Sequence, residues 1–402
     1  MIYCAILFLL VCLSFQYDLN GTKKGRDIWY GIMLMAFILV AGLRWRIGID
    51  TPAYLYNFYH EYPPLGQFSW EDYPIGKDPF FALVNSFVKT IGGRFYLVQL
   101  IQATIVNVLI FKFIKKHSKY IFACLFFYAL TCYTTYNMEI MRGGLSIVIC
   151  LFANDYVLEK KWIKAYLLYL LALMFHAQTL LLLLLPLLTS LRFNKRGIFI
   201  MCGAFLLGIL AARYLGDYFA LLEGDSSLAH KLSAYSQHEK YGTQGGNLNF
   251  YIVQIFPILF YVLFSFLHIK KRYPGSHILR YEPFIVLGVM FILIRMNLEI
   301  AYRYVDYFKI YFVLFFAEVF MKMIEGNRLK GLRRAVLNSF IIFIPFILVF
   351  FVYNYVLSRE YSLRYTPYST VIDRTVSKKR EAMYQDLNAG RSFFPGPNVD
   401  EY

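Results

Sequence analysis

The sequence AYLLYLLALMFHAQTLLLLLLPLLTSL, residues 165–191, contains 27 residues and no charged side chain. A single helix needs about 20 apolar residues to cross a bilayer, so this run exceeds one ordinary span and falls short of two. His176 lies near its middle, beside Gln178. We interpret the run as two shortened helices that meet near His176, and this interpretation decides the topology of the chain.

The whole chain has the composition of a membrane protein. Of its 402 residues 59% are hydrophobic and 16% are charged, whereas a soluble domain contains about 25% charged residues. Nucleic-acid binding, which the net charge of +16 would otherwise suggest, is therefore not predicted. The six cysteines lie in apolar stretches without metal-ligand spacing. The predicted fold class is all-α, a polytopic membrane helix bundle with about 11–13 transmembrane helices.

Apolar segments recur along the sequence. We predict one transmembrane helical domain over 1–357, with outer loops at about 44–78 and 216–248, and an outer-face tail over 358–402. An amphipathic piece at about 79–91 is short enough to be re-entrant or interfacial. The predicted spans are about 1–17, 28–43, 95–114, 120–137, 143–158, 163–175, 177–191, 197–215, 249–268, 283–302, 304–321 and 335–357.

The distribution of basic residues predicts the orientation. Positively charged side chains concentrate in the cytoplasmic loops of membrane proteins. Six clusters hold 22 of the 41 Lys and Arg residues, and all six lie on one side if the 165–191 run crosses the membrane twice and the N-terminus faces out. These clusters lie at 23–26, 112–119, 160–164, 192–196, 270–280 and 322–334.

With this orientation, an unusual arginine pair lies on the outer side. Arg44 and Arg46 follow the second span in GLRWRIGIDTPAY, residues 42–54, which also contains Asp50 and Tyr54. Guanidinium groups bind phosphate through two parallel hydrogen bonds. Interfacial snorkelling of the two arginines is an equally open interpretation.

Two further motifs lie on the same side. In YNMEIMRGG, residues 136–144, Glu139 and Arg142 are three apart and would share a helix face, either neutralising each other or exposing Arg142 to a ligand beside Gly143 and Gly144. His176 is either a structural hydrogen-bonding group or a general base for a sugar hydroxyl.

The last polar group has helical spacing. Arg295, Glu299, Arg303 and Asp306 would form one stripe on a continuous helix. The stripe sums to zero charge, so it either neutralises itself or supplies Arg303 to a substrate. The neighbouring aromatic rings, which suit either sugar stacking or a membrane-interface belt, are Tyr302, Tyr304 and Tyr307.

The order of these motifs resembles the EpsG-like branch of the Wzy-type bacterial polysaccharide polymerases, a group that also includes O-antigen polymerases. The resemblance runs over nearly the whole chain. It rests on GLRWRIGIDTPAY, DPFFALVNSFVKTIG, MEIMRGGLSIVI with Arg142, FHAQTLLLLLLPL with His176, RYVDYFKIYF with Arg303, and LRYTPYS with Tyr368.

The resemblance implies a bundle similar to GT-C-type membrane glycosyltransferases in the cytoplasmic (inner) membrane, with its active site on the periplasmic or extracellular side. The implied enzyme joins repeat units carried by a polyprenyl-diphosphate oligosaccharide, which serves as both donor and acceptor. Its implied partners are the lipid bilayer and a chain-length regulator, and neither a metal nor a cofactor is expected.

Roles for individual residues follow from the same resemblance. We expect Arg142 to act in catalysis, with either His176 or Asp50 as the base. The expected diphosphate and glycan ligands are Arg44, Arg46, Arg303, Arg295, Tyr54, Tyr304 and Tyr368.

Three other functions stay open. A flippase of lipid-linked sugars also needs cationic cavities, but transporters usually contain internal repeats, and the sequence contains none that we detect. An O-antigen ligase and a membrane O-acyltransferase are the alternatives among enzymes.

Overall fold

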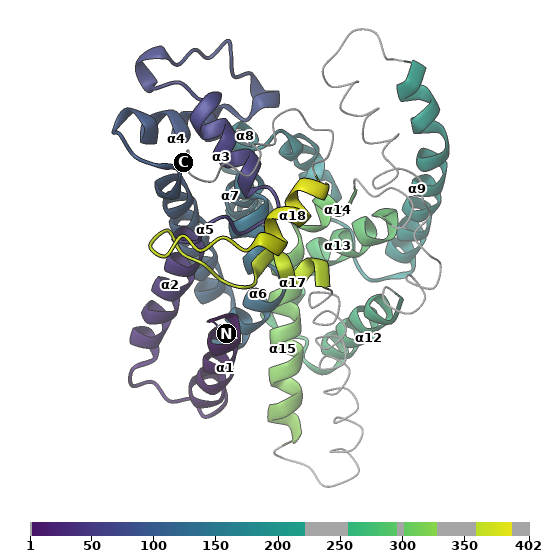
Figure 1. Ribbon diagram of the computed structural model, residues 1–402. Helices are drawn as coiled ribbons and strands as arrows, with labels where there is room; N and C mark the ends of the chain where they lie inside the picture. Colours follow the sequence, from purple (N-terminus) through teal and green to yellow (C-terminus); the bar gives the residue numbers. More distant parts are fainter. Residues whose placement is uncertain (1, 222–255, 296–300, 328–358, 388–402) are drawn as a thin grey trace. The chain divides into compact units, whose positions relative to one another are not determined.

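The computed structural model of the chain describes residues 2–221, 256–295, 301–327 and 359–387 (Figure 1). These residues form helices and one isolated β-bridge, between Arg44 and Thr370, which confirms the predicted all-α fold. The chain divides into two compact units. The first contains Met1–Leu185 and Phe320–Tyr402, and the second contains Pro186–Val319.

The described helices are those of a membrane protein. Four are long and apolar enough to cross a bilayer, namely Ile2–Leu19, Phe95–His117, Met141–Leu158 and His277–Arg295. Shorter apolar helices cover Ile121–Thr131, Trp162–Phe175 and Ala177–Leu188. The predicted span at 335–357 lies outside the described residues, and so does the start of that at 249–268.

The first unit is built from helices that run alongside one another and from short helices at their ends. Its elements are α1 (Ile2–Leu13), η1 (Ser14–Leu19), α2 (Arg26–Gly42), α3 (Thr51–His60), η2 (Leu65–Gln67), η3 (Ile75–Lys77), α4 (Pro79–Thr90), α5 (Phe95–His117), α6 (Ile121–Thr131), η4 (Thr135–Glu139), α7 (Met141–Leu158), α8 (Trp162–Phe175), the start of η5 (Ala177–Leu188), the end of α15 (Lys309–Asn327), α17 (Arg359–Tyr365) and α18 (Lys378–Leu387).

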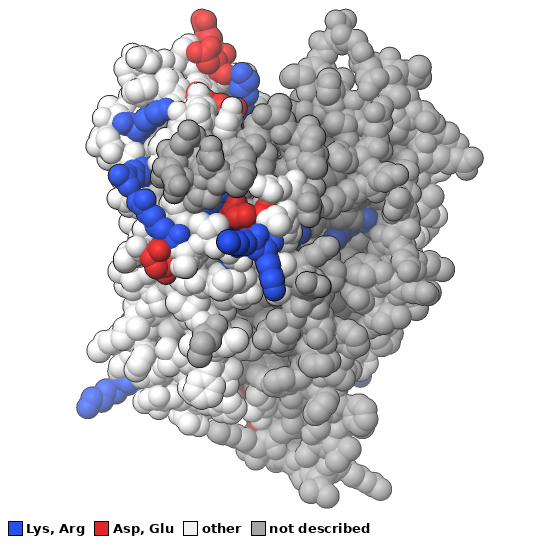
Figure 2. All heavy atoms as spheres, viewed as in Figure 1, with Lys and Arg blue, Asp and Glu red and all other residues white. Residues whose placement is uncertain are grey.

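Helix α2 illustrates why these sequences form membrane helices. Ile28, Ile32, Met35 and Leu39 follow one helix face and are exposed, whereas Phe37 on the opposite face is fully buried. A contiguous apolar stripe is unfavourable in water and suits contact with lipid. In Figure 2 the surface over α1 and α2 is mostly uncharged, and charged side chains gather around α17, α18, α3 and α4.

The two ends of the first unit carry different residues. At one end α2 begins and α5 and α7 finish, and there Lys115 pairs with Asp27 at 2.7 Å and Lys116 with Asp155 at 2.9 Å. The opposite end holds the last residue of α2, the first of α7 and the last of α8. The basic clusters 23–26, 112–119 and 160–164 therefore lie at one end, and the 42–54 and 136–144 motifs and His176 lie at the other.

Small residues allow the close helix packing that membrane bundles use. A Cβ atom added to Gly42 would lie 2.9 Å from the Leu100 Cα, where α2 meets α5. A Cβ atom added to Gly144 would lie 2.2 Å from the Tyr136 carbonyl oxygen. Gly144 thus lets α7 pack against η4. Gly144 therefore serves close backbone packing, whereas the sequence led us to expect that it leaves space for a ligand.

The C-terminal segment pairs with the loop after α2. The Trp45 amide donates to the Ser369 carbonyl at 2.9 Å, and the Val371 amide donates to the Leu43 carbonyl at 2.9 Å. These bonds flank the bridge between Arg44 and Thr370. The closing motif LRYTPYS is therefore part of the same structure as the first motif, GLRWRIGIDTPAY.

The second unit contains the rest of η5, α9 (Lys195–Leu221), α12 (Phe256–Arg272), η7 (His277–Tyr281), α13 (Glu282–Arg295), α14 (Tyr302–Val305) and the start of α15 (Lys309–Asn327). Glu282 is buried and accepts hydrogen bonds from the Phe193 amide at 2.8 Å and from Lys270 at 3.1 Å. A buried carboxylate needs such partners.

The expected charge stripe does not lie on one continuous helix. The short helix α14 ends at Val305, and a turn separates it from α15. Asp306 in that turn pairs with Lys309 at 2.5 Å. The Arg295 guanidinium lies 5.0 Å from the centre of the Tyr302 ring. Glu299 lies outside the described residues.

Candidate functional site

Asp78 brings together three elements of the first unit. Its carboxylate accepts a 2.6 Å hydrogen bond from Arg142 at the start of α7 and a 3.0 Å bond from the Ala177 amide. His176 Nδ1 lies 3.5 Å from the oxygen that Ala177 contacts. The guanidinium and the imidazole, 64 and 98 residues away from Asp78 in sequence, thus lie beside the same carboxylate. They form the polar cluster that we name the Asp78 cluster, consisting of Asp78, Arg142 and His176.

The backbone and environment of Asp78 are unusual. It precedes α4 in the left-handed conformation, with φ 54° and ψ 63°, which Asp and Asn adopt more readily than most residues. The residue is 3% exposed. Burial by itself raises the pKa of Asp78, but the neighbouring His176 imidazole and the charge of Arg142 outweigh it and hold that pKa below its usual value. The cluster therefore holds an ionised buried carboxylate at neutral pH.

Arg142 does not face Glu139, the partner that the spacing predicted. The helix changes direction at Ile140, with φ −95° and ψ 60°, so the two side chains do not share a face. Glu139 instead lies 3.4 Å from Arg364. The Arg142 side chain is 36% exposed, and its Nε has no hydrogen-bond partner. Because this Nε is buried, only the exposed part of the guanidinium is available to a ligand.

Tyr54 covers the other side of Arg142. The Arg142 guanidinium carbon lies 5.5 Å from the centre of the Tyr54 ring, within the range of a cation–π contact. Tyr54 is buried on α3, and burial raises the pKa of its hydroxyl. Asp50, at the N-terminus of the same helix, is exposed and also influences the charge state of Tyr54.

His176 lies where the long apolar run breaks, as its sequence predicted. Helix α8 ends at Phe175, His176 is extended with φ −159°, and η5 begins at Ala177. Its Nε2 lies 3.1 Å from the Gln178 side-chain oxygen. A Cβ atom added to Gly143 would contact the imidazole ring at 3.6 Å. The ring is thus positioned between α4, α7 and its own extended backbone.

The two arginines of the first motif have partners within the protein. Arg44 is completely buried, and its guanidinium donates to the Ala41 carbonyl at 2.5 Å and to the Ile47 carbonyl at 3.1 Å. Arg46 is 6% exposed and forms two parallel bonds to Glu381, at 2.9 and 2.6 Å. Arg44 thus fixes the loop after α2, and Arg46 joins this loop to the C-terminal segment.

Three more predicted residues lie in the second unit or in the C-terminal segment. Tyr304 stacks on Phe291 with ring centres 5.3 Å apart, and Arg303 lies beside it on α14. Tyr368 donates to the Val40 carbonyl at 3.0 Å. Of the ten predicted site residues, Arg142, His176 and Tyr54 lie together around Asp78.

Asp78 was not predicted as a site residue, although its motif was noted. The signal was an Asp–Pro pair directly before an amphipathic helix, which is also an ordinary helix start. Glu381 was likewise missed. In the described ranges, no three His, Cys, Asp or Glu side chains lie close enough to hold a metal ion.

The fold and the site define an integral membrane protein whose polar cluster lies at the ends of its helices. The sequence matches the EpsG family over residues 27–370, so the chain belongs to this family. As a member of it, the protein is a polysaccharide-polymerase-type membrane glycosyltransferase. Neither the curated proteins nor the solved structures that were compared contain a match.

Proposed function

We propose that this protein polymerises oligosaccharide repeat units carried on polyprenyl diphosphate, at the outer leaflet of the cytoplasmic membrane, into a bacterial surface polysaccharide. The observation that carries the proposal is the Asp78 cluster in a chain of the EpsG family. Its residues match the needs of a glycosyl transfer with a charged leaving group.

The reaction assigns a separate task to each residue. Asp78 orients His176 and favours the tautomer with a proton on Nδ1. Nε2 lies 3.1 Å from the Gln178 side-chain oxygen, which only accepts hydrogen bonds, so in this tautomer Nε2 gives up that contact and accepts the proton of an acceptor hydroxyl instead. The acceptor oxygen then forms a bond to the anomeric carbon, and the bond from that carbon to the diphosphate breaks. The polyprenyl diphosphate leaves with the bonding electron pair, and Arg142 stabilises its negative charge. The proton stays on His176 until solvent removes it.

The Nδ1 to Oδ1 distance of 3.5 Å is longer than a hydrogen bond. Hydrogen bonds of catalytic groups are often long before substrate binds. We expect this distance to shorten when an anionic substrate approaches Arg142, because the substrate competes for its guanidinium and frees Asp78 for His176.

Chain growth by the purified protein tests the proposal. In detergent with a polyprenyl-diphosphate oligosaccharide, we expect a ladder of products from the wild type and little product from Arg142→Ala and His176→Ala. His277→Ala and Arg280→Ala change exposed residues of the same types and serve as controls. Wild-type ladders from both cluster variants would exclude this site. Translocation of the lipid without chain growth would indicate a flippase.

The basic clusters lie at the end of the first unit opposite to the Asp78 cluster, and this supports the proposal that the Asp78 cluster faces the outer side of the membrane. Single cysteines at Gln67 and Lys24, both exposed and at opposite ends of the first unit, test it in a background in which Cys4, Cys12 and Cys202 are serine. A membrane-impermeant maleimide should label Gln67→Cys in intact cells and Lys24→Cys only after permeabilisation. The reverse pattern would place the cluster on the cytoplasmic side.

A further inference from the structure

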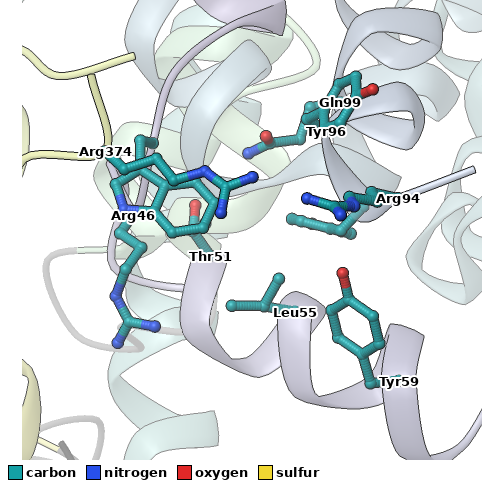
Figure 3. Close-up of a pocket in the computed structure, with 10 residues that line it drawn as sticks. Arg46, Thr51, Leu55, Tyr59, Arg94, Tyr96, Gln99 and Arg374 are labelled. Carbon is teal, nitrogen blue, oxygen red and sulfur yellow. The ribbon is translucent and has the colours of Figure 1, made fainter. Parts of the chain in front are cut away.

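A second polar site lies beside α3 in the first unit. A pocket there is lined by residues from the loop after α2, α3, the start of α5 and the C-terminal segment (Figure 3). Thr51, Leu55 and Tyr59 are four apart and present one face of α3 to this pocket. Tyr54, on another face of the same helix, contacts Arg142. Helix α3 thus separates the pocket from the Asp78 cluster.

Two exposed arginines face each other across the pocket. Figure 3 shows the Arg94 and Arg374 guanidinium groups directed toward its centre, and the Arg46 guanidinium directed away from it. Arg46 is already paired with Glu381. No carboxylate lines the pocket, and among the described residues neither Arg94 nor Arg374 forms an ion pair within 4.0 Å. Two facing cations repel each other, and an anion between them removes this repulsion.

Gln99 supplies an independent indication of a ligand. The residue is 2% exposed, and its side-chain nitrogen has no hydrogen-bond partner. Figure 3 shows its amide directed into the pocket, toward the side of Arg374. A buried donor without a partner costs free energy, and such groups in native structures require an explanation. The indole nitrogen of Trp45, another lining residue, is also buried without a partner.

The buried nitrogens of Gln99 and Trp45 and the guanidinium groups of Arg94 and Arg374 are donors, and Arg374 Nε also donates to the Val371 carbonyl at 3.4 Å. Aromatic rings surround these donors. Tyr59, Tyr96 and Trp45 line the pocket, and Arg374 lies 5.2 Å from the Trp45 ring centre. Aromatic faces beside amide and guanidinium donors suit the apolar faces and oxygen atoms of sugars.

We propose that this pocket binds an oxyanion carried by a sugar, either a carboxylate or a phosphate, in the glycan that the Asp78 cluster elongates. Arg94 and Arg374 form charge-assisted hydrogen bonds to the oxyanion, and the Gln99 amide donates a third. The assignment of the ligand to the growing glycan rests on the proposed function, whereas binding of a sugar oxyanion does not. An acidic repeat unit held here would keep the glycan on the far side of α3 from the leaving diphosphate.

Equilibrium binding to the purified full-length protein in detergent tests the proposal. The probes are glucuronic acid, glucose 1-phosphate, inorganic phosphate and neutral glucose. Tryptophan fluorescence reports on Trp45 in a background in which the other three tryptophans, Trp29, Trp70 and Trp162, are phenylalanine. We expect glucuronic acid or glucose 1-phosphate to bind more tightly than glucose and inorganic phosphate, and the tighter of the two identifies the oxyanion. Equal binding of glucose, or preference for inorganic phosphate, would overturn the proposal.

Three variants locate the binding. Arg94→Ala and Arg374→Ala should each weaken binding of the preferred probe by about 10- to 100-fold, the range expected for a hydrogen bond to a charged group. Gln99→Leu should weaken it by about tenfold without lowering the thermal midpoint, because a buried donor without a partner is replaced by an apolar group of similar size. Lys24→Ala, which removes an exposed charge elsewhere, should bind as the wild type does. Wild-type binding by the Arg94→Ala, Arg374→Ala double variant would refute the site.

The binding result is independent of chain growth. Asp78→Asn should lower chain growth by about 10²–10⁴ and leave probe binding unchanged. If no variant or wild type elongates a glycan but the sugar oxyanion still binds, the proposed function fails and the pocket stands. If chain growth proceeds but no probe binds, the pocket assignment fails and the proposed function stands.

Discussion

Replacing Asp78 by asparagine separates the charge of the Asp78 cluster from its shape. Asparagine tolerates the left-handed conformation as well as aspartate does, so the backbone at φ 54° stays unstrained. The carboxylate accepts a 2.6 Å bond from Arg142 and a 3.0 Å bond from the Ala177 amide. Each bond loses about 1 kcal/mol when its acceptor becomes neutral.

The charge left on Arg142 adds to this loss. Removing one partner of a fully buried ion pair costs about 3–5 kcal/mol, but the Arg142 side chain is 36% exposed and solvent screens it. We therefore expect Asp78→Asn to lower the free energy of unfolding by about 2–3 kcal/mol at pH 7. Chain growth should fall by about 10²–10⁴, because His176 loses its orienting carboxylate.

The dependence on pH has a defined sign. The pKa of Asp78 is lower in the folded protein than its usual value. Its stabilising contribution is therefore present above a pH of about 4 and is lost as the pH falls below that value toward the folded pKa. The difference in stability between wild type and variant should shrink over this interval.

Detergent-induced unfolding followed by tryptophan fluorescence, at several pH values from 7 to 3, measures both effects. Asp72→Asn changes an exposed aspartate of the neighbouring loop and provides the matched control. Equal unfolding curves for wild type and Asp78→Asn at pH 7 would refute the reasoning. So would a stability difference that does not change on acidification.

Two further variants test the packing of the first unit. Gly144→Ala should lower the free energy of unfolding by about 1–3 kcal/mol, because the added Cβ would lie 2.2 Å from the Tyr136 carbonyl oxygen. The control is Gly31→Ala, where nothing lies within 4 Å of the added Cβ. Equal midpoints of thermal unfolding for the two variants would contradict this prediction. Glu381→Gln should weaken the attachment of α18 by about 1–3 kcal/mol, since it neutralises the partner of Arg46. Limited proteolysis should then cleave the C-terminal segment faster than in the wild type. An unchanged cleavage rate would show that the Arg46–Glu381 pair does not hold this segment.

The C-terminal segment connects the family match to the site. The match ends at residue 370, which forms the bridge with Arg44, so the paired backbone lies inside it except for Val371, which directly follows it. Helix α18 and Arg374 lie beyond it. The Asp78 cluster is thus contained in the matched region, whereas the Arg46–Glu381 pair and part of the oxyanion pocket depend on residues after it.

Several features could be predicted from local sequence. The helix break at His176 follows from an apolar run too long for one span, with a polar residue at its centre. The separation of the basic clusters from the polar motifs follows from the alternation of apolar and basic segments. Both are properties of neighbouring residues, so periodicity and composition suffice to predict them.

The partners of the charged side chains could not be predicted in this way. Spacing paired Glu139 with Arg142, but the backbone turns at Ile140 and sends the two side chains to Arg364 and Asp78. The sequence by itself determined that this chain is a membrane helix bundle with polar residues at one end, because burial of apolar surface acts on every segment locally. Only the tertiary structure decided which charges meet, because Asp78, Arg142 and His176 lie on segments far apart in the chain, and the pairing of charges depends on geometry and not on sequence distance.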